Sequence, residues 1–361
     1  MYSRDSAGRR YHEGIHPYRG PFARDRDRIL HSSAFRRLSG KMQVFTGDMG
    51  TYHRTRLTHT FEVASIARTI ARKLQLNEDL TEALALMHDI GHPPFGHCGE
   101  DVLSECMESS GGFSHNQFAL TIVEELEQRY SGFPGLNLSR ELLAGQDVRA
   151  HKAEAAVGRA PILEVQVVDA ADSIAYDAHD VDDALQMGLL TTDELSELKI
   201  VSRALDRMRQ RLGRVPTHQF RQNLVHELLD LQVTDLLDAG ITRLQPLQGR
   251  RSEHVCGDGV RLTHHDELAA ERAELETFMF ESVYRHPRLM TIRDSASRRL
   301  RQVFETLEKS PDRLPLRFRQ RITGSSVNRV VGEYIAGMTD QFCDSQFEYI
   351  QESDVGPLAD W

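Results

Sequence analysis

Apolar residues recur at three- and four-residue spacing along most of the chain, which places them on one face of an α-helix. Strand-like alternation of apolar and polar residues is almost absent. The pattern therefore predicts an all-α fold. Helical spacing is found over these ranges: 22–38, 58–74, 78–87, 101–107, 115–130, 161–188, 192–212, 217–239, 265–284, 289–309 and 325–347.

The predicted helix over 78–87 leads into an unusually polar stretch, residues 88–100. Within that stretch Gly91 and Pro93 are expected to end the helix. We expect the first two polar residues on the last helical turn and the others on a tight turn after it. A helix end with a histidine favoured by the helix dipole would be an ordinary explanation of one His-Asp pair. Imidazole and carboxylate groups together also suit divalent metals such as Mn, Fe, Co, Ni or Mg. The stretch contains three histidines and two carboxylates: His88, Asp89, His92, His97 and Glu100.

Two other predicted helices carry polar residues that could complete such a site. Arg56 and His59 lie three residues apart at the start of the helix over 58–74, so both point to one side. Asp172, Tyr176 and Asp180 recur every four residues on the helix over 161–188. That stripe is either an exposed charged face or the wall of a site, and a tyrosine between two acids favours a wall.

Composition limits the class of protein. The 361 residues are 40% hydrophobic and 27% charged, an ordinary globular balance, and the net charge of −10 argues against a broad nucleic-acid surface. The four cysteines form no CxxC pair, which disfavours a zinc ribbon or a disulfide framework. The first 40 residues lack the apolar segment of a signal peptide, and no apolar run reaches the ~20 residues of a membrane span. We expect a cytoplasmic protein without a membrane partner.

The order of His59, then His88-Asp89, then Asp172 matches that of HD-domain metal-dependent phosphohydrolases. Longer segments resemble one family within that superfamily, the deoxyguanosinetriphosphate triphosphohydrolases (dGTPases), and are spread over nearly the whole chain. They are FRRLSGKMQVF (35–45), RTRLTHTFEVASIAR (54–68), HDIGHPPFGHCGE (88–100), SHNQFAL (114–120), VQVVDAADSIAYDAHDVDDA (165–184) and EYIAGMTD (333–340).

The resemblance implies an all-helical HD core around a single-metal site. His59, His88, Asp89 and Asp172 would hold one divalent ion, with Mn²⁺ or Mg²⁺ expected first and Fe, Co or Ni as alternatives. The reaction implied is hydrolysis of a deoxynucleoside triphosphate (dNTP) to deoxynucleoside and inorganic triphosphate.

The remaining roles also follow from the resemblance. His97 and Glu100 match a catalytic His-x-x-acid pair, and His115 matches a further active-site histidine. The residues that match substrate contacts are Arg56 for a phosphate, His92 near the α-phosphate, and Tyr176, Asp180 and Gln43 for the deoxyribose. Met42 departs from the polar residue that many relatives carry. Residues 145–160, expected to be a loop, and residues 245–262 are not among the segments that carry the resemblance.

For the organisation of the chain we expect an N-terminal arm over 1–21, an HD catalytic core over 22–190, and a helical C-terminal extension over 191–361 packed on that core as one unit. The resemblance implies an oligomer, and long amphipathic C-terminal helices need partners for any apolar area left over. We therefore expect a homo-oligomer, a tetramer or a hexamer. Some family members depend on a nucleotide or single-stranded DNA effector, so a regulatory site is possible here.

Three other functions fit parts of the pattern. Another HD phosphohydrolase, such as a nucleotidase or an alarmone hydrolase, shares the metal ligands but needs neither the His97–Glu100 pair nor the sugar-facing stripe. A non-haem iron oxygenase also uses two histidines and a carboxylate, but the phosphate-oriented Arg56 disfavours it. A nucleotide-sensing regulator would not need the complete set of catalytic residues.

Overall fold

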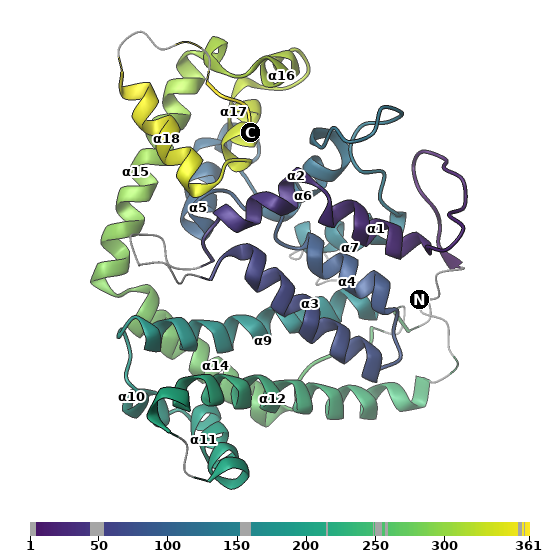
Figure 1. The fold of residues 1–361 in the computed structure, drawn as a ribbon, viewed down its shortest axis with the longest axis vertical. Helices are drawn as coiled ribbons and strands as arrows, with labels where there is room; N and C mark the ends of the chain where they lie inside the picture. The colour runs from purple at the N-terminus through teal and green to yellow at the C-terminus, as the bar shows by residue number, and fades with distance from the viewer. Residues whose placement is uncertain are drawn as a thin grey trace. The chain divides into compact units, whose positions relative to one another are not determined.

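The computed structural model describes residues 5–43, 54–151, 160–213, 216–247, 249, 255–256, 259–352, 356 and 358–361. Within these ranges every regular element is helical (Figure 1), and strand-like pairing is limited to isolated bridges between Arg9 and Ser139 and between Met42 and Thr55. The all-α prediction is confirmed. Among the described residues, no helix is both long and apolar enough to cross a membrane.

The chain divides into two compact units. The first contains Glu62–Ala85 and Ala153–Met290, and the second contains Ser3–Phe61, Leu86–Lys152 and Thr291–Trp361. The expected division into arm, core and extension stays a prediction.

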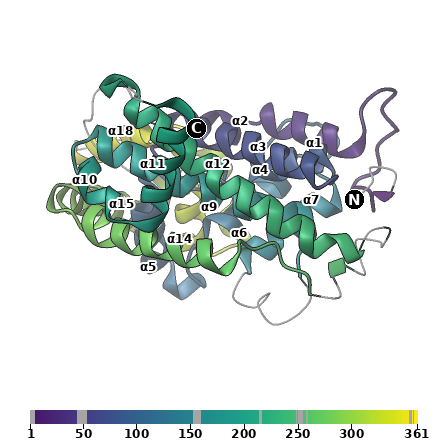
Figure 2. The same cartoon turned by 90° about the horizontal axis from the view of Figure 1, so that it is seen from below.

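The first unit is built on α9, a 24-residue helix that packs against α12, which in turn packs against α11. Figures 1 and 2 both show α9 and α12 side by side. Salt bridges join the helices, as between Arg272 of α14 and Asp177 of α9. The elements of the first unit are most of α3 (Arg56–Lys73) and of α4 (Glu78–Met87), α9 (Leu163–Gln186), α10 (Thr192–Ser196), α11 (Lys199–Leu212), α12 (Thr217–Leu244), η5 (Gln245–Leu247), α14 (Asp266–Met279) and the π-helix η6 (Phe280–Tyr284).

In the second unit α6 packs on α7, and α17 packs on α5. The beginning of α3 and the end of α4 also belong to it. Its other elements are α1 (Pro21–Leu30), α2 (Ser33–Arg37), η2 (Leu38–Gly40), α5 (Gly96–Cys106), η3 (Glu108–Ser110), α6 (His115–Thr121), the π-helix η4 (Ile122–Leu126), α7 (Arg140–Ala150), most of α15 (Pro287–Lys309), η7 (Pro311–Arg313), α16 (Leu316–Arg319), η8 (Gln320–Thr323), α17 (Val327–Ala336) and α18 (Asp340–Gln351).

The hydrophobic period located α4 correctly, and its apolar face is buried. Three predicted helices are wrong in that each is two helices. The range 192–212 divides into α10 and α11, with a break between Ser196 and Lys199, and the other two divide at capping residues. The range 22–38 is interrupted at Ser32, whose hydroxyl accepts the N–H of Phe35 and starts α2. The range 325–347 is interrupted after Ala336, and Thr339 caps α18 in the same way by accepting the N–H of Phe342. In both places a capping side chain satisfies donors that a continuous helix would satisfy internally.

Two predicted non-helical segments are also corrected. His97 and Glu100 lie on α5, which begins at Gly96 rather than near residue 101, because the left-handed backbone of Phe95 and Gly96 (φ 63° and 60°) starts the helix abruptly. Residues 145–150, expected to be a loop, belong to α7. The buried face of α7 includes Gln146 and Arg149, so its low apolar content concealed the helix. Residues 152–159 and much of 245–262 lie outside the described residues.

Candidate active site

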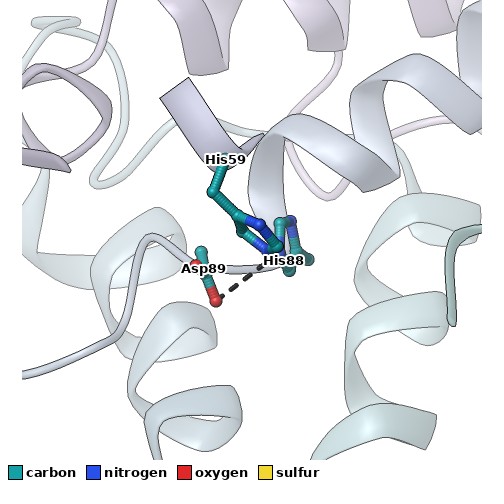
Figure 3. Close-up of side chains that lie close together, drawn as sticks. All are labelled: His59, His88 and Asp89. Atoms are coloured by element: carbon teal, nitrogen blue, oxygen red, sulfur yellow. Dashed lines mark ion pairs between the residues drawn. The ribbon is translucent and has the colours of Figure 1, made fainter. Parts of the chain in front are cut away.

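Three buried side chains of the second unit form a cluster suited to a metal ion. His59 comes from the first turn of α3, and His88 and Asp89 follow the end of α4 (Figure 3). One donor atom of each lies within 4.8 Å of the others. The Nε2 atom of His88 is 3.5 Å from the Asp89 carboxylate, and the two imidazole rings have centroids 5.7 Å apart. Two imidazoles and one carboxylate fit a divalent metal ion.

Gly91 allows α6 to pack closely against the segment that follows His88 and Asp89. A Cβ atom on Gly91 would lie 2.0 Å from the carbonyl oxygen of His115 and 2.6 Å from the amide nitrogen of Ala119. Only glycine therefore lets the first turn of α6 approach the segment after the His-Asp pair. Sequence analysis identified Gly91 as a helix-ending signal, and the structure adds that it provides this close approach.

Arg56 forms a salt bridge with the carboxylate of Asp89. Its Nη1 donates to Asp89 Oδ2 at 2.9 Å, and both side chains are almost fully buried. Burial alone would raise the pKa of Asp89, but the charges of His88, Arg56 and His92 outweigh it and hold that pKa well below its usual range. Asp89 is therefore an ionised oxygen donor at neutral pH. Arg56 Nη2 also approaches the backbone carbonyl of Gln43, at 3.4 Å.

A second group of polar side chains continues from the first. The Nε2 atom of His92 is 3.2 Å from Asp89 Oδ1, and the His92 ring stacks on that of His115 with centroids 3.8 Å apart. His115 Nδ1–H donates to Glu100, at 2.8 Å from Oε1. The His97 ring is 3.6 Å from the same carboxylate, and its side chain is 64% exposed.

Glu100 also accepts the backbone N–H of His115 at 2.9 Å, so it fixes both the peptide and the ring at the start of α6. Burial acts to raise the pKa of Glu100, but the hydrogen bonds from His115 and His97 and the nearby imidazole charges lower it far below its usual range. Glu100 is thus an ionised acceptor that holds one imidazole closely and has a second within reach.

The C-terminal helices hold the segments around this site. Each oxygen of the half-buried Asp340 carboxylate, at the start of α18, accepts one backbone N–H, from Met42 at 3.0 Å and from Phe95 at 2.9 Å. The side-chain nitrogen of the buried Lys41 donates to the carbonyl of His92, and to that of Ala336 at 2.9 Å. The side chains of Asp340 and Lys41 thereby fix the turn that carries His92.

Gln43, expected at the deoxyribose, is 9% exposed, and its side-chain oxygen has no hydrogen-bond partner among the described residues. A buried amide oxygen without a partner is suited to accept a hydrogen bond from a ligand. The residues that follow it, 44–53, lie outside the described residues.

The other predicted site residues belong to α9, in the first unit. Asp172 is half-buried, and its part in metal binding stays a prediction. Tyr176 and Asp180 meet Tyr284, which ends η6. The Tyr284 hydroxyl donates to Asp180, and the rings of the two tyrosines have centroids 6.2 Å apart. Burial raises the pKa of Asp180 to about 8, although hydrogen bonds from both tyrosines oppose that shift and the charges of Asp183 and Asp177 add to it.

Sequence analysis missed Tyr284, Lys41 and Asp340. Tyr284 stands in a single turn of π-helix, a form often found at functional sites, but its sequence carries no signal for that turn. Asp340 ends the EYIAGMTD segment that carried part of the resemblance. Its role depends on backbone groups about 250 and 300 residues away in the chain (separations of 245 and 298).

Comparison with known proteins agrees with this geometry. Residues 56–177 match the model of the HD domain, and residues 262–349 match that of the phosphohydrolase-associated domain. A deoxyguanosinetriphosphate triphosphohydrolase-like protein of Geobacter metallireducens is 40% identical over 97% of this chain and 93% of its own length. A deoxyguanosinetriphosphate triphosphohydrolase-like protein of Nitrosomonas europaea is 38% identical over 95% of this chain and 94% of its own length. The chain belongs to the deoxyguanosinetriphosphate triphosphohydrolase-like family.

Membership of the dGTPase-like family confirms the expected family, the all-α HD fold and hydrolase activity. The HD-domain match contains all four predicted metal ligands, and the domain implies a divalent metal ion. His59, His88 and Asp89 fit that ion by donor type and by distance. The match to the phosphohydrolase-associated domain covers both Tyr284 and Asp340.

Proposed function

We propose that the chain hydrolyses a dNTP such as dGTP to deoxynucleoside and inorganic triphosphate. The observation that carries this proposal is the adjacency of two clusters in one unit. The donors of His59, His88 and Asp89 connect through His92 to the imidazole–carboxylate group of His115 and Glu100. Such an arrangement suits attack at a phosphorus atom combined with proton transfer to or from an ester oxygen.

In this proposal His59, His88, Asp89 and Asp172 hold one divalent ion, Mn²⁺ or Mg²⁺ before Fe, Co or Ni. When bound, the ion supplies Lewis-acid polarisation of a phosphate oxygen and a template for its orientation. Asp172 is assigned from the order of the HD motif.

Side chains of the protein would bind the phosphates and transfer the proton. Arg56 offers a planar fork of N–H donors to a phosphate oxygen beside Asp89, which a lysine would not reproduce. His92 is near the α-phosphate. His97 transfers the proton, because its exposed ring is free to turn toward the substrate. Glu100 stabilises its charged form and keeps His115 in place.

Selection of the sugar is assigned to Gln43 and to the α9 stripe. Asp180 and Tyr176 offer an acceptor and a donor to the 3′-hydroxyl, and Tyr284 fixes Asp180 by hydrogen bonding. A tyrosine ring under C2′ would leave no space for a 2′-hydroxyl, which would exclude ribonucleotides.

We further propose that the protein acts in the cytoplasm as a homo-oligomer, a tetramer or a hexamer, and that a nucleotide or single-stranded DNA effector regulates it. The HD core over 22–190 and the extension over 191–361 would work as one unit. Light scattering tests assembly directly, since a monomer mass near 41.0 kDa at micromolar concentration would contradict it.

The decisive experiment is product analysis. The purified protein is incubated with each of the four dNTPs in Mn²⁺ or Mg²⁺, with and without single-stranded DNA, and the phosphate product is identified. Inorganic triphosphate supports the proposal. Orthophosphate or pyrophosphate would instead assign the chain to another HD phosphohydrolase activity, such as that of a nucleotidase or an alarmone hydrolase.

A further inference from the structure

A second trio of potential metal donors lies beside the first cluster. One donor atom each of His92, His97 and Glu100 lies within 4.8 Å of the others. His92 is 3% exposed, whereas the His97 side chain is mostly exposed, so the trio has a buried side and an open side. Two imidazoles, one carboxylate and open positions toward solvent form a donor set that zinc and similar ions accept.

The buried member of the trio has unused hydrogen-bonding capacity. Nε2 of His92 is near Asp89, but Nδ1 is buried and has no hydrogen-bond partner among the described residues. Leaving a buried ring nitrogen unsatisfied costs free energy, and a ligand that uses it recovers that cost. Lys41 and Asp340 hold the turn that carries His92, so the nitrogen has a fixed position.

We propose that His92, His97 and Glu100 form a second binding site for a borderline divalent metal ion of the Zn²⁺ or Co²⁺ class. Imidazole-rich sets favour these ions over Mg²⁺, which prefers oxygen donors. The site is separate from that of His59, His88 and Asp89 in its protein donors.

Two features make this site the weaker one. Glu100 must give up part of its hydrogen bonding to His115 to bind an ion. The site also lies at the N-terminal turn of α5, where the helix dipole disfavours cations. The second site should therefore need a higher concentration of free ion than the first.

Occupancy has a functional consequence that rests on the proposed function. An ion on the ring of His97 and on Glu100 removes both from proton transfer. Excess Zn²⁺ should then inhibit the Mn²⁺-loaded enzyme, whereas excess Mg²⁺ should not.

The site itself is tested without reference to activity. Metal-free protein is dialysed against increasing Co²⁺, and bound metal per chain is measured together with the visible spectrum. Wild type should bind two ions with distinct spectra. His97→Ala and His59→Ala should each bind one, with the second-site spectrum missing in the first variant and retained in the second. His31→Ala, at an exposed histidine of the same unit, should still bind two.

A single ion in wild type at saturating Co²⁺ would overturn the proposal, as would two ions in His97→Ala with an unchanged spectrum. Circular dichroism identifies misfolded variants, and His97→Gln then replaces His97→Ala in the same measurement. Because the readout is bound metal, its result stands whether or not dNTP hydrolysis is found.

Discussion

The Glu100 carboxylate holds the ring of His115 more closely than that of His97. Nδ1 of His115 is 2.8 Å from Oε1, whereas Nδ1 of His97 is 3.6 Å from Oε2. The family resemblance implied that Glu100 is paired with His97. In the structure Glu100 secures the start of α6, whereas the His97 side chain is mostly exposed.

That arrangement predicts different losses from the two residues. His97→Ala should lower kcat by about 10²–10⁴-fold, the usual contribution of proton transfer, while metal content at the first site stays near wild type. Glu100→Gln should lose less, because an amide oxygen still accepts the His115 N–H groups but does not stabilise a charged ring. Steady-state kinetics and metal analysis on both variants check this. A larger loss in Glu100→Gln would indicate that positioning of His115 dominates.

Metal binding should depend on Asp172. Asp172→Ala deletes a charged ligand, so bound metal at the first site and activity should fall together, while the helical content stays unchanged because the apolar core does not depend on the ion. Metal analysis and circular dichroism measure the two. Asp169→Ala, one turn earlier on α9, is the matched control and should keep its metal. Full occupancy in Asp172→Ala would remove this residue from the ligand set.

Discrimination between sugars should depend on the two tyrosines. Tyr176→Ala should raise the kcat/KM of GTP relative to that of dGTP, because the space under C2′ opens. Tyr284→Phe keeps the ring but removes the donor to Asp180, so it should raise KM for dGTP with a smaller change in the ratio. Equal losses for both nucleotides in Tyr176→Ala would show that this residue is structural.

The raised pKa of Asp180, about 8 against the ordinary 3.8, makes stability depend on pH. The folded protein retains a proton that the unfolded chain releases above its own pKa, so the free energy of unfolding should fall as pH rises through this window. Asp180→Asn resembles the protonated form and should lose less stability over the same range. Urea unfolding of wild type and Asp180→Asn at about pH 5.5 and 8.5 measures the two changes in the free energy of unfolding. Equal losses in the two proteins would contradict the role given to Asp180.

Close packing at Gly91 predicts a local but costly mutation. Gly91→Ala places a methyl group against the backbone of α6, which must shift, and overpacking of this kind costs about 1–3 kcal/mol. Activity should fall as well, because His115 moves with α6. Gly132→Ala, where a Cβ atom meets nothing within 4 Å, should change the free energy of unfolding by less than ~0.5 kcal/mol. Equal denaturation midpoints for the two variants would show that α6 adapts freely.

Sequence alone located the parts of this fold that rest on local periodicity. The helix over 78–87 was identified to the residue, because Leu80, Ala83, Leu84 and Met87 repeat at helical spacing and lie in the core. The His-Asp pair after it was identified as a metal-site candidate from its chemistry and the order of its partners.

Local periodicity could not predict interactions between segments that are distant in the chain. Glu100 and His115 are 15 residues apart, and only the path of the chain between them decides which histidine the carboxylate holds. The start of α5 was concealed by Pro94 and Gly96, because both usually signal a break. Here Gly96, together with Phe95, has the left-handed backbone at which the helix begins. Tyr284 acquires a role only through its contact with Asp180 on another helix.

The attachment of Phe95 to Asp340 also has a consequence for synthesis of the chain. Asp340 is added 245 residues after Phe95, which at cellular rates of ~5–20 residues per second is a delay of roughly 10–50 s. Through that interval the nascent chain has its His-Asp pair but lacks the carboxylate that holds the following turn. The hydrogen bond to Phe95 forms only when the start of α18 has left the ribosome, so the turn stays incomplete until at least 245 further residues have been added.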